Sequence, residues 1–373
     1  MKKILIIAND ESTILNFRCE IVENFVQSGF DVTVCYPLAE NTESIACLGC
    51  RVENVNVSRH GKDVLKDIKF LFDCKKLIKK YQPDIVLTYT VKPNIYASIA
   101  CQMTKTPYLN NVTGLGSILQ NGGALSKLIL KLQKIGYRKS NCVFFQNEEN
   151  RDKLEELGVI KENTPTVILP GSGVNLEKQK YETFPADDGI TRFVIVSRVR
   201  ADKGYYEFFE AAQSVKRKYP NTEFHVIGWY EEENLTPVVD KLHKEGIIIY
   251  HGKKLQEEVH EIEKNCNCLV HPSYHEGMAN VLLEAAATGR PVIASNIHGC
   301  MEAFEEGITG FGCEPKNAAS LVDAMEKLIH TPYEKQIEMG KLARRKMETE
   351  FDRQIVANKY IEMINKTLEE KAQ

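Results

Sequence analysis

Short apolar runs alternate with longer amphipathic stretches along the whole chain. The runs KILIIA (3–8), DIVLTY (84–89) and NCLVHP (267–272) have strand length and are apolar at most positions. Strands that are apolar on both faces are typical of a parallel sheet covered by helices on both sides. The pattern therefore predicts a doubly wound α/β protein.

The alternation occurs twice, with a polar break rich in turn formers at 171–190. Before the break, strands are expected at 3–8, 31–37, 51–57, 84–89, 107–112, 142–146 and 165–170, and helices near 14–28, 63–80, 94–104 and 124–139. After it, strands are expected at 192–199, 223–228, 247–252, 267–272 and 291–295, and the last helices near 316–331, 334–350 and 352–370. We therefore expect two Rossmann-like domains, residues 1–175 and 190–352, followed by a C-terminal helix at 353–373.

The composition is that of a soluble globular protein, with 43% apolar and 27% charged residues in a chain of 373. A net charge of −3 gives no indication of nucleic-acid binding. No run of 18 apolar residues occurs, and MKKILIIAND reads as a first strand and not as a signal peptide. The eleven cysteines form no disulfide framework, so we expect reduced thiols in a cytoplasmic protein.

Segments of the second half that follow strands carry residues suited to an anionic ligand. In VSRVRADKGYYEF, Arg198 and Lys203 lie on the loop after a strand, and Gly204 opens the next helix. Two cations near a helix N-terminus form a phosphate site, because the helix amides add to their charge. The alternative interpretation is a solvated pair of loop charges.

The segment YHEGMANVLLEAAATG holds Glu276 in a loop and Glu284 inside an apolar helix. An ionised carboxylate in such a helix is costly unless it is hydrogen-bonded. Glu284 can accept hydrogen bonds from the paired hydroxyls of a ribose, and the alternative is a buried salt bridge. Glu276 can accept hydroxyls of a sugar, and Gly277 lets backbone amides approach a ligand closely. In the next segment, NIHGCMEAFEEGITGFG, Glu302 is either at the same site or a surface glutamate.

Together these segments resemble family 4 of the retaining GT-B glycosyltransferases. The resemblance rests on the order Arg198…Lys203-Gly204, Glu276-Gly277-x6-Glu284, Gly289-x-Pro291-Val292 and Gly307-x-x-Gly310. It implies two Rossmann-like domains that face each other across a cleft, with the C-terminal helix crossing back to the first domain. It also implies a nucleotide-sugar donor in the second domain and no metal, in keeping with the absence of an Asp-x-Asp motif.

The resemblance implies a role for each matching residue. Arg198, Lys203 and Glu276 are expected to act in catalysis, the first two on the departing diphosphate and the third on the transferred sugar. The other residues expected to bind the donor are Gly277, Met278, Ala279 and Asn280 at the sugar and Glu284 at the ribose.

The first half resembles a subgroup of bacterial enzymes that extend lipid-linked oligosaccharides for capsule, O-antigen or glycoprotein synthesis. This subgroup includes N-acetylgalactosaminyltransferases that act on diphospho-undecaprenyl-linked sugars. The likeness is carried by LNFRCEIVENFVQSGFDVTV, YTVKPNIYASIA and NNVTGLGSIL. The glycine-rich loop that is common after the first strand in the wider family is replaced by Asn-Asp-Glu-Ser-Thr at 9–13.

An acceptor that carries its own diphosphate requires cations near the first sheet. Arg18 and Lys92 follow the carboxyl ends of strands, and Thr113 and Gly114 follow the strand at 107–112, so these four residues are expected to bind the acceptor. For Arg18 and Lys92 the alternative is a solvent-exposed basic side chain. His60 is a weaker candidate, because a lone histidine is more often structural.

The stretch GALSKLILKLQKIGYRKS (123–140) predicts a basic amphipathic helix. Lys127, Lys131, Lys134 and Arg138 recur at helical spacing in one stripe, opposite a face of leucine and isoleucine. Such a helix can lie in an anionic membrane surface, and the lysines of the 63–80 helix add to its charge. The alternative is an ordinary domain helix with its apolar face on the sheet.

The sequence thus predicts a retaining, metal-independent hexosyltransferase, peripheral at the cytoplasmic face of the inner membrane. It would move GalNAc, GlcNAc or Gal from a UDP-sugar to a polyprenyl-diphosphate-linked saccharide. The UDP-sugar is a substrate, and no cofactor and no nucleic-acid partner are expected. The alternatives are an inverting GT-B transferase, a UDP-sugar epimerase, and a nucleotide-sugar-binding protein without catalysis.

Overall fold

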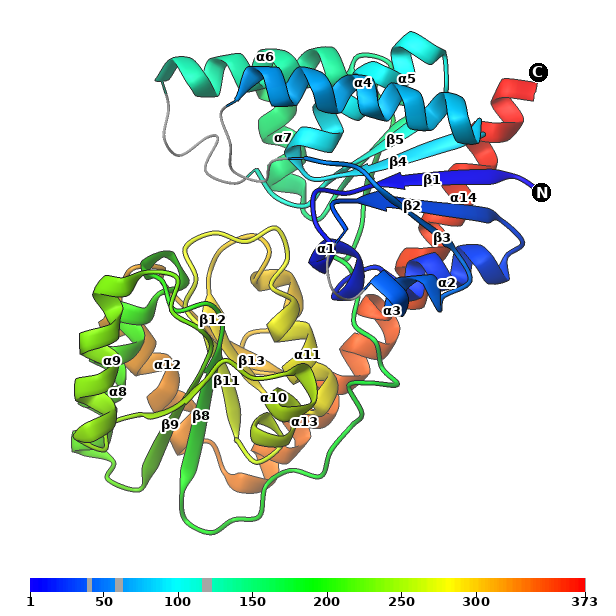
Figure 1. Cartoon of the computed structure of the whole chain (residues 1–373). Coiled ribbons are helices and arrows are strands. Elements are labelled where there is room, and N and C mark those ends of the chain that lie inside the picture. Colours follow the sequence, from blue (N-terminus) through cyan, green and yellow to red (C-terminus); the bar gives the residue numbers. More distant parts are fainter. Residues whose placement is uncertain (39–41, 58–62, 116–122, 373) are drawn as a thin grey trace. The chain divides into compact units, whose positions relative to one another are not determined.

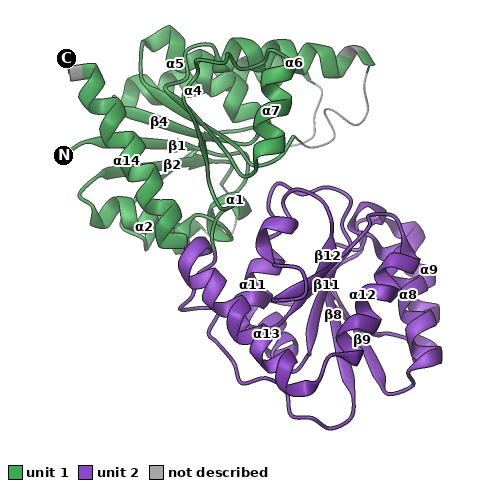
Figure 2. Cartoon of the chain, turned by 180° about the vertical axis from the view of Figure 1, so that it is seen from behind, with its two compact units in different colours: residues 1–173, 353–373 green, residues 174–352 purple. Residues whose placement is uncertain are grey.

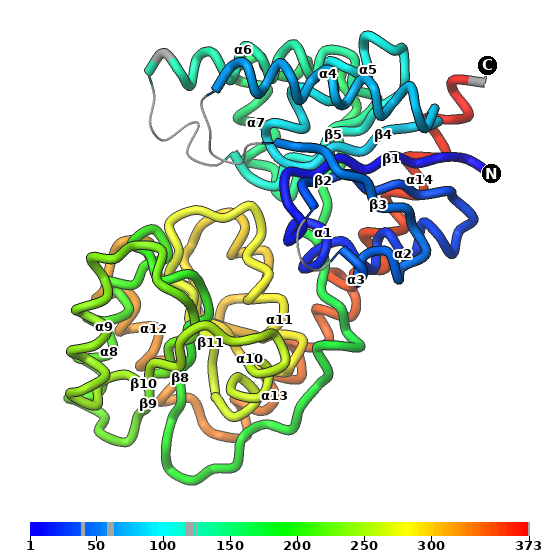
Figure 3. The backbone as a smooth tube through the Cα atoms, in the orientation of Figure 1, coloured from blue at the N-terminus to red at the C-terminus, as the bar shows by residue number. Residues whose placement is uncertain are grey.

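The computed structural model describes residues 1–38, 42–57, 63–115 and 123–372 (Figure 1). The chain forms two compact units. Unit 1 comprises residues 1–173 and 353–373, and unit 2 comprises residues 174–352 (Figure 2). The chain passes from unit 1 into unit 2 and returns to unit 1 with its last helix (Figure 3).

Unit 1 is built on a parallel sheet, which has seven strands within the described residues, in the order β3-β2-β1-β4-β5-β6-β7. The strands are β1 (Lys3–Ile7), β2 (Asp31–Tyr36), β3 (Arg51–Asn54), β4 (Ile85–Tyr89), β5 (Tyr108–Val112), β6 (Cys142–Phe145) and β7 (Thr166–Ile168). The strand order reverses between β1 and β4. In open α/β sheets, ligands bind outside the carboxyl ends of the strands at such a reversal.

Helices cover both faces of this sheet. They are α1 (Ser12–Leu15), α2 (Cys19–Gln27), α3 (Thr42–Ala46), α4 (Val64–Tyr81), η1 (Pro93–Ala97), α5 (Ser98–Thr104), α6 (Gly123–Tyr137), α7 (Glu148–Glu156) and α14 (Arg353–Ala372). Phe25 of α2 and Tyr360 of α14 pack into the core on one face. Phe70 of α4 and Ala100 of α5 pack into the core on the other face.

The helix expected near 14–28 is broken into α1 and α2. Asp10 caps the first piece, because its Oδ1 accepts a hydrogen bond from the amide of Thr13 at 2.8 Å. The backbone leaves the helical region at Arg18 (φ −140°, ψ 3°), and the guanidinium of Arg18 donates to the carbonyl of Thr13 at 3.0 Å. The expectation of one continuous helix is therefore wrong, and the break fixes the Arg18 side chain.

The C-terminal helix α14 is anchored to unit 1 by polar contacts. Arg353 Nη1 donates to Glu20 Oε2 of α2 at 2.5 Å, and Arg353 Nη2 donates to the carbonyl of Gly173 at 3.2 Å. Tyr360 Oη donates to Asn111 Oδ1 at 2.5 Å. Arg353, Tyr360 and Asn111 are buried and the Glu20 side chain is 14% exposed, so the charges of the ion pair are largely removed from water.

Unit 2 repeats the architecture, with six parallel strands in the order β10-β9-β8-β11-β12-β13 within the described residues. The strands are β8 (Thr191–Val196), β9 (Thr222–Ile227), β10 (Ile249–Gly252), β11 (Cys268–His271), β12 (Val292–Ser295) and β13 (Gly310–Cys313). The order reverses between β8 and β11. Two Rossmann-like doubly wound domains are thus confirmed, and the ligand-binding edge of unit 2 is expected after these two strands.

Two layers of helices enclose the sheet of unit 2. Helices α8, α9 and α12 lie on one face, and α10, α11 and α13 on the other (Figure 1). The helical segments are η3 (Ala201–Lys203), α8 (Tyr205–Lys218), η4 (Glu233–Leu235), α9 (Thr236–Lys244), α10 (Gln256–Glu263), α11 (Asn280–Thr288), η5 (Met301–Ala303), α12 (Ala318–His330), α13 (Tyr333–Lys346) and η6 (Met347–Phe351).

Two further expectations from the sequence concern disulfide bonds between the cysteines and helices that could span a membrane. All eleven cysteines lie in described residues, and no disulfide joins any of them. Among the described residues, every helix is too short or too polar to traverse a bilayer.

Candidate active site

The loops that follow β8 and β11 pack directly on each other in unit 2. The amide of Tyr274 donates to the carbonyl of Asp202 at 2.9 Å, which ties the two loops together. Gly204 makes this approach possible, because a Cβ at this position would lie 2.0 Å from the carbonyl oxygen of Pro272. Its φ of +74° is also a conformation that glycine adopts without strain. The residue before it, Lys203, is thereby aimed at the loop that carries Glu276.

Lys203 and Glu276 form a close ion pair at this edge. Lys203 Nζ donates to Glu276 Oε1 at 2.6 Å, and the two side chains are only 15% and 13% exposed. His271, the last residue of β11, places its Nε2 at 2.7 Å from the same oxygen. Burial by itself would raise the pKa of Glu276, but the hydrogen bond and charge of His271, with the charge of Lys203, lower it well below its usual range. Glu276 is therefore an ionised acceptor.

The loop from Glu276 to α11 is held in place by Gly299. The amide of Ala279 donates to the carbonyl of Gly299 at 2.8 Å, so this amide is already engaged within the protein. A Cβ on Gly299 would lie 2.8 Å from the carbonyl oxygen of Gly277, which requires glycine at this contact. Met278 is buried, and Asn280 begins α11 with a buried Oδ1 that accepts no hydrogen bond from the described residues.

Glu284 lies in the second turn of α11 and is half-buried. Its Oε1 accepts a hydrogen bond at 3.2 Å from Nε2 of Gln256, the first residue of α10. Nearby, burial and then the charge of Glu284 raise the pKa of Glu263 to about 8, so Glu263 is mainly protonated at neutral pH. The hydrogen bond from neutral Gln256 differs from the buried salt bridge that the sequence left open as an alternative.

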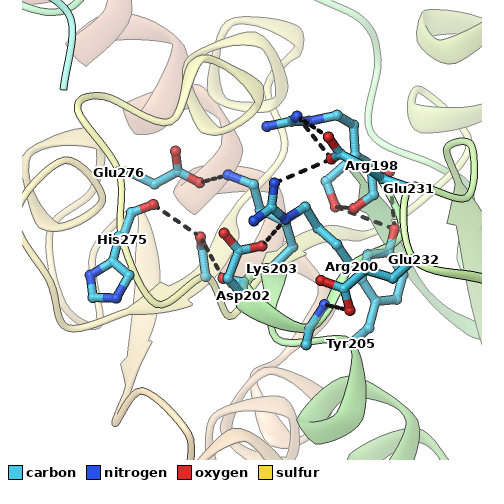
Figure 4. A network of polar contacts seen from close by, with 12 residues as sticks. Arg198, Arg200, Asp202, Lys203, Tyr205, Glu231, Glu232, His275 and Glu276 are labelled. Atoms are coloured by element: carbon cyan, nitrogen blue, oxygen red, sulfur yellow. Dashed lines mark hydrogen bonds and ion pairs between the residues drawn. The ribbon is translucent and has the colours of Figure 1, made fainter. Parts of the chain in front are cut away.

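Arg198 belongs to a cluster of charges beside the Lys203–Glu276 pair (Figure 4). Arg198 Nη1 lies 2.8 Å from Glu231 Oε2, and Arg200 Nη1 lies 3.3 Å from the same oxygen. Arg200 also pairs with Asp202 of the loop that positions Lys203. Arg198 is therefore a paired but accessible cation, 38% exposed, and not an isolated loop charge.

Sequence reasoning missed several members of this site. The sequence places His271 only within the predicted strand at 267–272, and it gives no sign of a role for Arg200 or Glu231. The contact between the loops after β8 and β9, in which the amide of Val199 donates to the carbonyl of Trp229 at 2.9 Å, brings Glu231 to the arginines. No spacing in the chain signals this contact. Glu302, which the sequence left as either a site residue or a surface glutamate, accepts a hydrogen bond from the amide of Gly299 at 2.7 Å and so stabilises its own loop.

The acceptor candidates lie after neighbouring strands of unit 1. Arg18 is 5% exposed, and its guanidinium lies 4.3 Å from the ring centre of Tyr89. Lys92 Nζ pairs with Asp67 Oδ1 of α4 at 2.6 Å, with both side chains largely buried. Neither cation is therefore the solvent-exposed side chain that was the alternative. Thr113 and Gly114 follow β5 and are half-buried, while His60 falls outside the described residues.

Helix α6 leaves a large part of its apolar face exposed, although Leu130 packs against the core that contains Tyr137. Its inward face consists of the buried residues Ser126, Gln133, Gly136 and Tyr137. Leu125, Leu128 and Ile135 are instead 41–49% exposed. The basic stripe Lys127, Lys131, Lys134 and Arg138 is exposed as well. Helix α6 thus packs on unit 1 through part of its surface while three of its large apolar side chains stay exposed.

Helix α4 presents the same combination beside α6. Both helices pack against η1, and they lie on the same side of the sheet in both views (Figures 1 and 2). The exposed apolar residues of α4 are Val64, Leu65, Ile68 and Phe72. Its exposed basic residues are Lys66, Lys69, Lys76, Lys79 and Lys80. We call the exposed apolar and basic residues of α4 and α6 the α4/α6 surface.

Both halves of the chain match glycosyltransferase family models. Residues 178–346 match "Glycosyl transferases group 1", and residues 3–147 match "Glycosyl transferase 4-like". Together with two Rossmann-like units, these matches identify the chain as a GT-B glycosyltransferase with a 4-like N-terminal domain and a group 1 C-terminal domain. The resemblance to GT-B glycosyltransferases seen in the sequence is thereby confirmed.

Two relatives are enzymes that act on lipid-linked saccharides. The chain is 27% identical over 373 residues, 96% of each chain, to the N,N'-diacetylbacillosaminyl-diphospho-undecaprenol alpha-1,3-N-acetylgalactosaminyltransferase of Campylobacter jejuni. It is 27% identical over 281 residues, 71% of each chain, to the UDP-Gal:alpha-D-GlcNAc-diphosphoundecaprenol alpha-1,3-galactosyltransferase of Escherichia coli. Among solved structures, Anabaena HepE in complex with UDP and glucose superposes with a TM-score of 0.78 at 17% identity, covering 98% of this chain and 100% of HepE.

Proposed function

We propose that this protein is a retaining glycosyltransferase that transfers a hexose from a UDP-sugar to a polyprenyl-diphosphate-linked saccharide in bacterial surface-glycan or glycoprotein synthesis. The observation that carries the proposal is the buried Lys203–Glu276 pair at the strand-order reversal of unit 2. A cation and an ionised carboxylate at one point suit a ligand with a diphosphate at one end and sugar hydroxyls at the other.

In the proposed donor complex, each charged group acts on a different part of the UDP-sugar. Lys203 and Arg198 bind the diphosphate and stabilise the negative charge that develops as it departs. Glu276 accepts hydrogen bonds from hydroxyls of the transferred sugar, which its lowered pKa permits at neutral pH. Glu284 accepts the ribose hydroxyls, for which it is oriented by Gln256. The loop of Gly277, Met278, Ala279 and Asn280 forms the wall beside the sugar.

Retention of configuration is proposed from the relatives together with the site. The Escherichia coli relative is named as a UDP-Gal-dependent alpha-1,3-galactosyltransferase, so an α-linked donor gives an alpha-1,3 product there. A retaining double displacement would need a second carboxylate about 5 Å from the first, across the reacting carbon. Glu276 is held by Lys203 and His271 and is proposed to bind sugar hydroxyls, not to attack the reacting carbon. We therefore propose a same-face displacement in which the departing diphosphate helps to deprotonate the incoming hydroxyl.

No metal is required by this proposal, because two cationic side chains supply the positive charge at the diphosphate. Among the described residues, no group of three or more histidine, cysteine, aspartate or glutamate side chains is arranged to hold a metal ion. GalNAc, GlcNAc and Gal are the hexoses that we propose to test, since the names of the two relatives include GalNAc and Gal as transferred sugars.

On the acceptor side, we propose that Lys92, Thr113 and Gly114 line the edge where the lipid-linked diphosphate binds. These residues follow β4 and β5, which are neighbours in the sheet of unit 1. Arg18 is too buried in this structure to contact much of the acceptor. Its guanidinium packs on the ring of Tyr89, the last residue of β4, and so helps to position the same edge. Binding of a diphosphate would compete with Asp67 for the ammonium group of Lys92.

The α4/α6 surface supports the proposed peripheral association with the cytoplasmic face of the inner membrane. Large apolar side chains such as Leu65, Phe72 and Leu128 are 49–79% exposed there, which costs free energy in water. Lysines flank them on both helices, and anionic lipid headgroups attract such lysines. An acceptor on a polyprenyl diphosphate is itself membrane-bound, so this surface would bring the enzyme to its substrate.

The double variant Lys127→Glu/Lys131→Glu should weaken binding to vesicles that contain phosphatidylglycerol by at least about tenfold, because each basic residue contributes about 1 kcal/mol. Co-flotation with liposomes measures this. The matched control is Lys241→Glu/Lys244→Glu, which reverses two exposed charges on α9 of unit 2. Equal binding by the two double variants, or unchanged binding to neutral and anionic vesicles, would contradict the membrane role of α6.

The proposed reaction is tested by incubating the protein with UDP-GalNAc, UDP-GlcNAc, UDP-Gal and GDP-mannose, each with a polyprenyl-diphosphate-linked saccharide. We expect one UDP-sugar to give a product with an α-glycosidic bond by NMR. A β-linked product would indicate an inverting enzyme, and conversion of the sugar without acceptor would indicate an epimerase. Tight UDP binding without turnover would indicate a binding protein, and GDP-mannose as the sole donor would refute the UDP assignment.

With the donor known, Glu284→Ala should raise the KM for that UDP-sugar about tenfold or more, since it removes a charged hydrogen-bond acceptor. The matched control is Glu261→Ala, an exposed glutamate on α10 that pairs with Lys264. Indistinguishable KM values for the two variants would remove the ribose role of Glu284.

A further inference from the structure

Trp229 is the single tryptophan of the chain and lies at the edge of unit 2 that carries the candidate donor site. It comes two residues after the carboxyl end of β9 and is 47% exposed. The preceding residue, Gly228, runs so close to the loop after β8 that a Cβ there would lie 1.8 Å from the carbonyl oxygen of Ser197. Only glycine fits this approach, which sets Trp229 beside the loop of Arg198.

The backbone register places the indole on the same face as the arginines. Val199 pairs with Tyr230 in a parallel bridge; Val199 is buried in the apolar core of unit 2, and Tyr230 packs against that core. Side chains of extended backbone alternate between faces, so the neighbours of these two residues point the other way. Arg198 and Arg200 on one segment therefore share a face with Trp229 and Glu231 on the other. The Arg198–Glu231 ion pair agrees with this assignment.

Trp229 also adjoins the segment between β10 and α10, which leads to Gln256. Lys253 Nζ lies 5.6 Å from the ring centre of Trp229, directly after the end of β10. Three residues later, Gln256 donates to Glu284. Between them, Leu255 is 68% exposed. The exposed indole thus stands between the cations proposed for the diphosphate and the segment that orients the carboxylate proposed for the ribose.

An exposed indole flanked by an ammonium group is suited to a flat, polar, aromatic ligand. Nucleobases stack on such rings, whichever base is present, because every base has a π-face. The nucleobase of a nucleoside diphosphate is attached to the same ribose that Glu284 is proposed to bind. We propose that Trp229 is the stacking platform for the nucleobase of the donor. This inference rests on the proposed function, since it assigns the third part of the same nucleotide.

Trp229 itself provides the measurement, because it is the only source of tryptophan emission in the protein. Titration of the wild-type protein with UDP should quench this emission and shift it to the blue, as the base covers the ring. Titration with inorganic pyrophosphate should leave the emission unchanged, because pyrophosphate occupies the cationic site without a base. Calorimetry on the same samples gives the affinities.

Variants separate stacking from an unspecific effect on the loop. Trp229→Ala should weaken UDP binding about tenfold, whereas Trp229→Phe, which keeps an aromatic face, should stay within about threefold of the wild type. Pyrophosphate affinity should be the same in all three proteins. The matched control is Tyr206→Ala, which removes a 45% exposed aromatic side chain from α8 and should leave UDP affinity unchanged.

The outcomes distinguish this inference from the proposed function. UDP binding that depends on Glu284 but neither changes Trp229 emission nor weakens in Trp229→Ala would overturn the platform and leave the donor site standing. The same holds if pyrophosphate quenches the emission as strongly as UDP, or if Trp229→Phe loses as much affinity as Trp229→Ala. Failure of UDP, GDP and ADP alike to bind the wild-type protein would overturn both.

Discussion

Replacing Lys203 by alanine should lower kcat by about 10²- to 10³-fold, because a preorganised cation at a departing diphosphate is typically worth that much. The structure gives two reasons for a large effect. Lys203 is held at 2.6 Å from Glu276 in a site from which both side chains are largely withdrawn from water. Its loss also leaves the carboxylate of Glu276 with His271 as its remaining partner among the ion pairs of the described residues.

Rate measurements at saturating donor and acceptor separate these contributions. Lys203→Arg keeps the charge and should recover part of kcat, although a guanidinium does not reproduce the point charge of an ammonium group. The control is Lys241→Ala, which removes an exposed lysine of α9 and should leave kcat unchanged. A Lys203→Ala enzyme with normal kcat and only a raised KM would show that the lysine binds the substrate without acting on the departing group.

The sequence could predict that Lys203 and Glu276 belong to one site because each follows a strand of a doubly wound sheet. It could not supply their direct contact, which depends on β8 and β11 being neighbours at the strand-order reversal. His271 was missed for a related reason. A histidine at the end of an apolar strand gives no sign that its ring turns toward a carboxylate five residues later. Only the turn of the intervening loop makes that contact.

The α6 helix shows where periodicity misleads. A helical wheel correctly separates the basic stripe from the apolar stripe, but it does not say which face turns inward. In the structure, Gly136 is pressed against η1, where a Cβ would lie 2.7 Å from the carbonyl oxygen of Asn94. This close approach turns Gly136 and the buried Gln133 inward and leaves Leu125, Leu128 and Ile135 exposed, while Leu130 packs against the core. The close approach of a neighbouring backbone therefore contributes to the orientation of this helix, which a helical wheel does not include.

The charge network around Arg198 was equally beyond sequence reasoning. Glu231 follows a different strand, 33 residues away, and reaches Arg198 only because the loops after β8 and β9 continue the sheet pairing at Val199. A family resemblance points to residues that match a motif. Partners that balance their charge, such as Arg200 and Glu231, can lie outside the motif and are seen only in the folded unit.

Arg353→Met should lower the free energy of unfolding of unit 1 by about 3 kcal/mol, because it removes the cation that offsets a buried carboxylate. The Arg353–Glu20 pair joins α14 to α2, and its side chains are 9% and 14% exposed. The same change removes the donor to the carbonyl of Gly173, at the point where the chain leaves unit 1. A methionine of similar length fills the space but supplies no charge.

Urea denaturation followed by far-UV circular dichroism measures the loss, and Trp229 emission provides a separate reporter for unit 2. We expect the variant to lower the midpoint seen by circular dichroism more than the midpoint seen by Trp229, since the broken contact lies wholly in unit 1. The matched control is Lys218→Met, which breaks the more exposed Lys218–Glu326 pair between α8 and α12. It should cost about 1 kcal/mol or less.

The double variant Glu20→Leu/Arg353→Met tests the cause of the effect. If the loss in Arg353→Met comes from an uncompensated buried charge, removing the carboxylate as well should restore part of the stability. If the double variant is instead as unstable as the sum of the two single variants, the ion pair contributes no coupling and the anchoring of α14 depends on its apolar face. Val356 and Tyr360, both buried against the sheet of unit 1, would then carry the attachment.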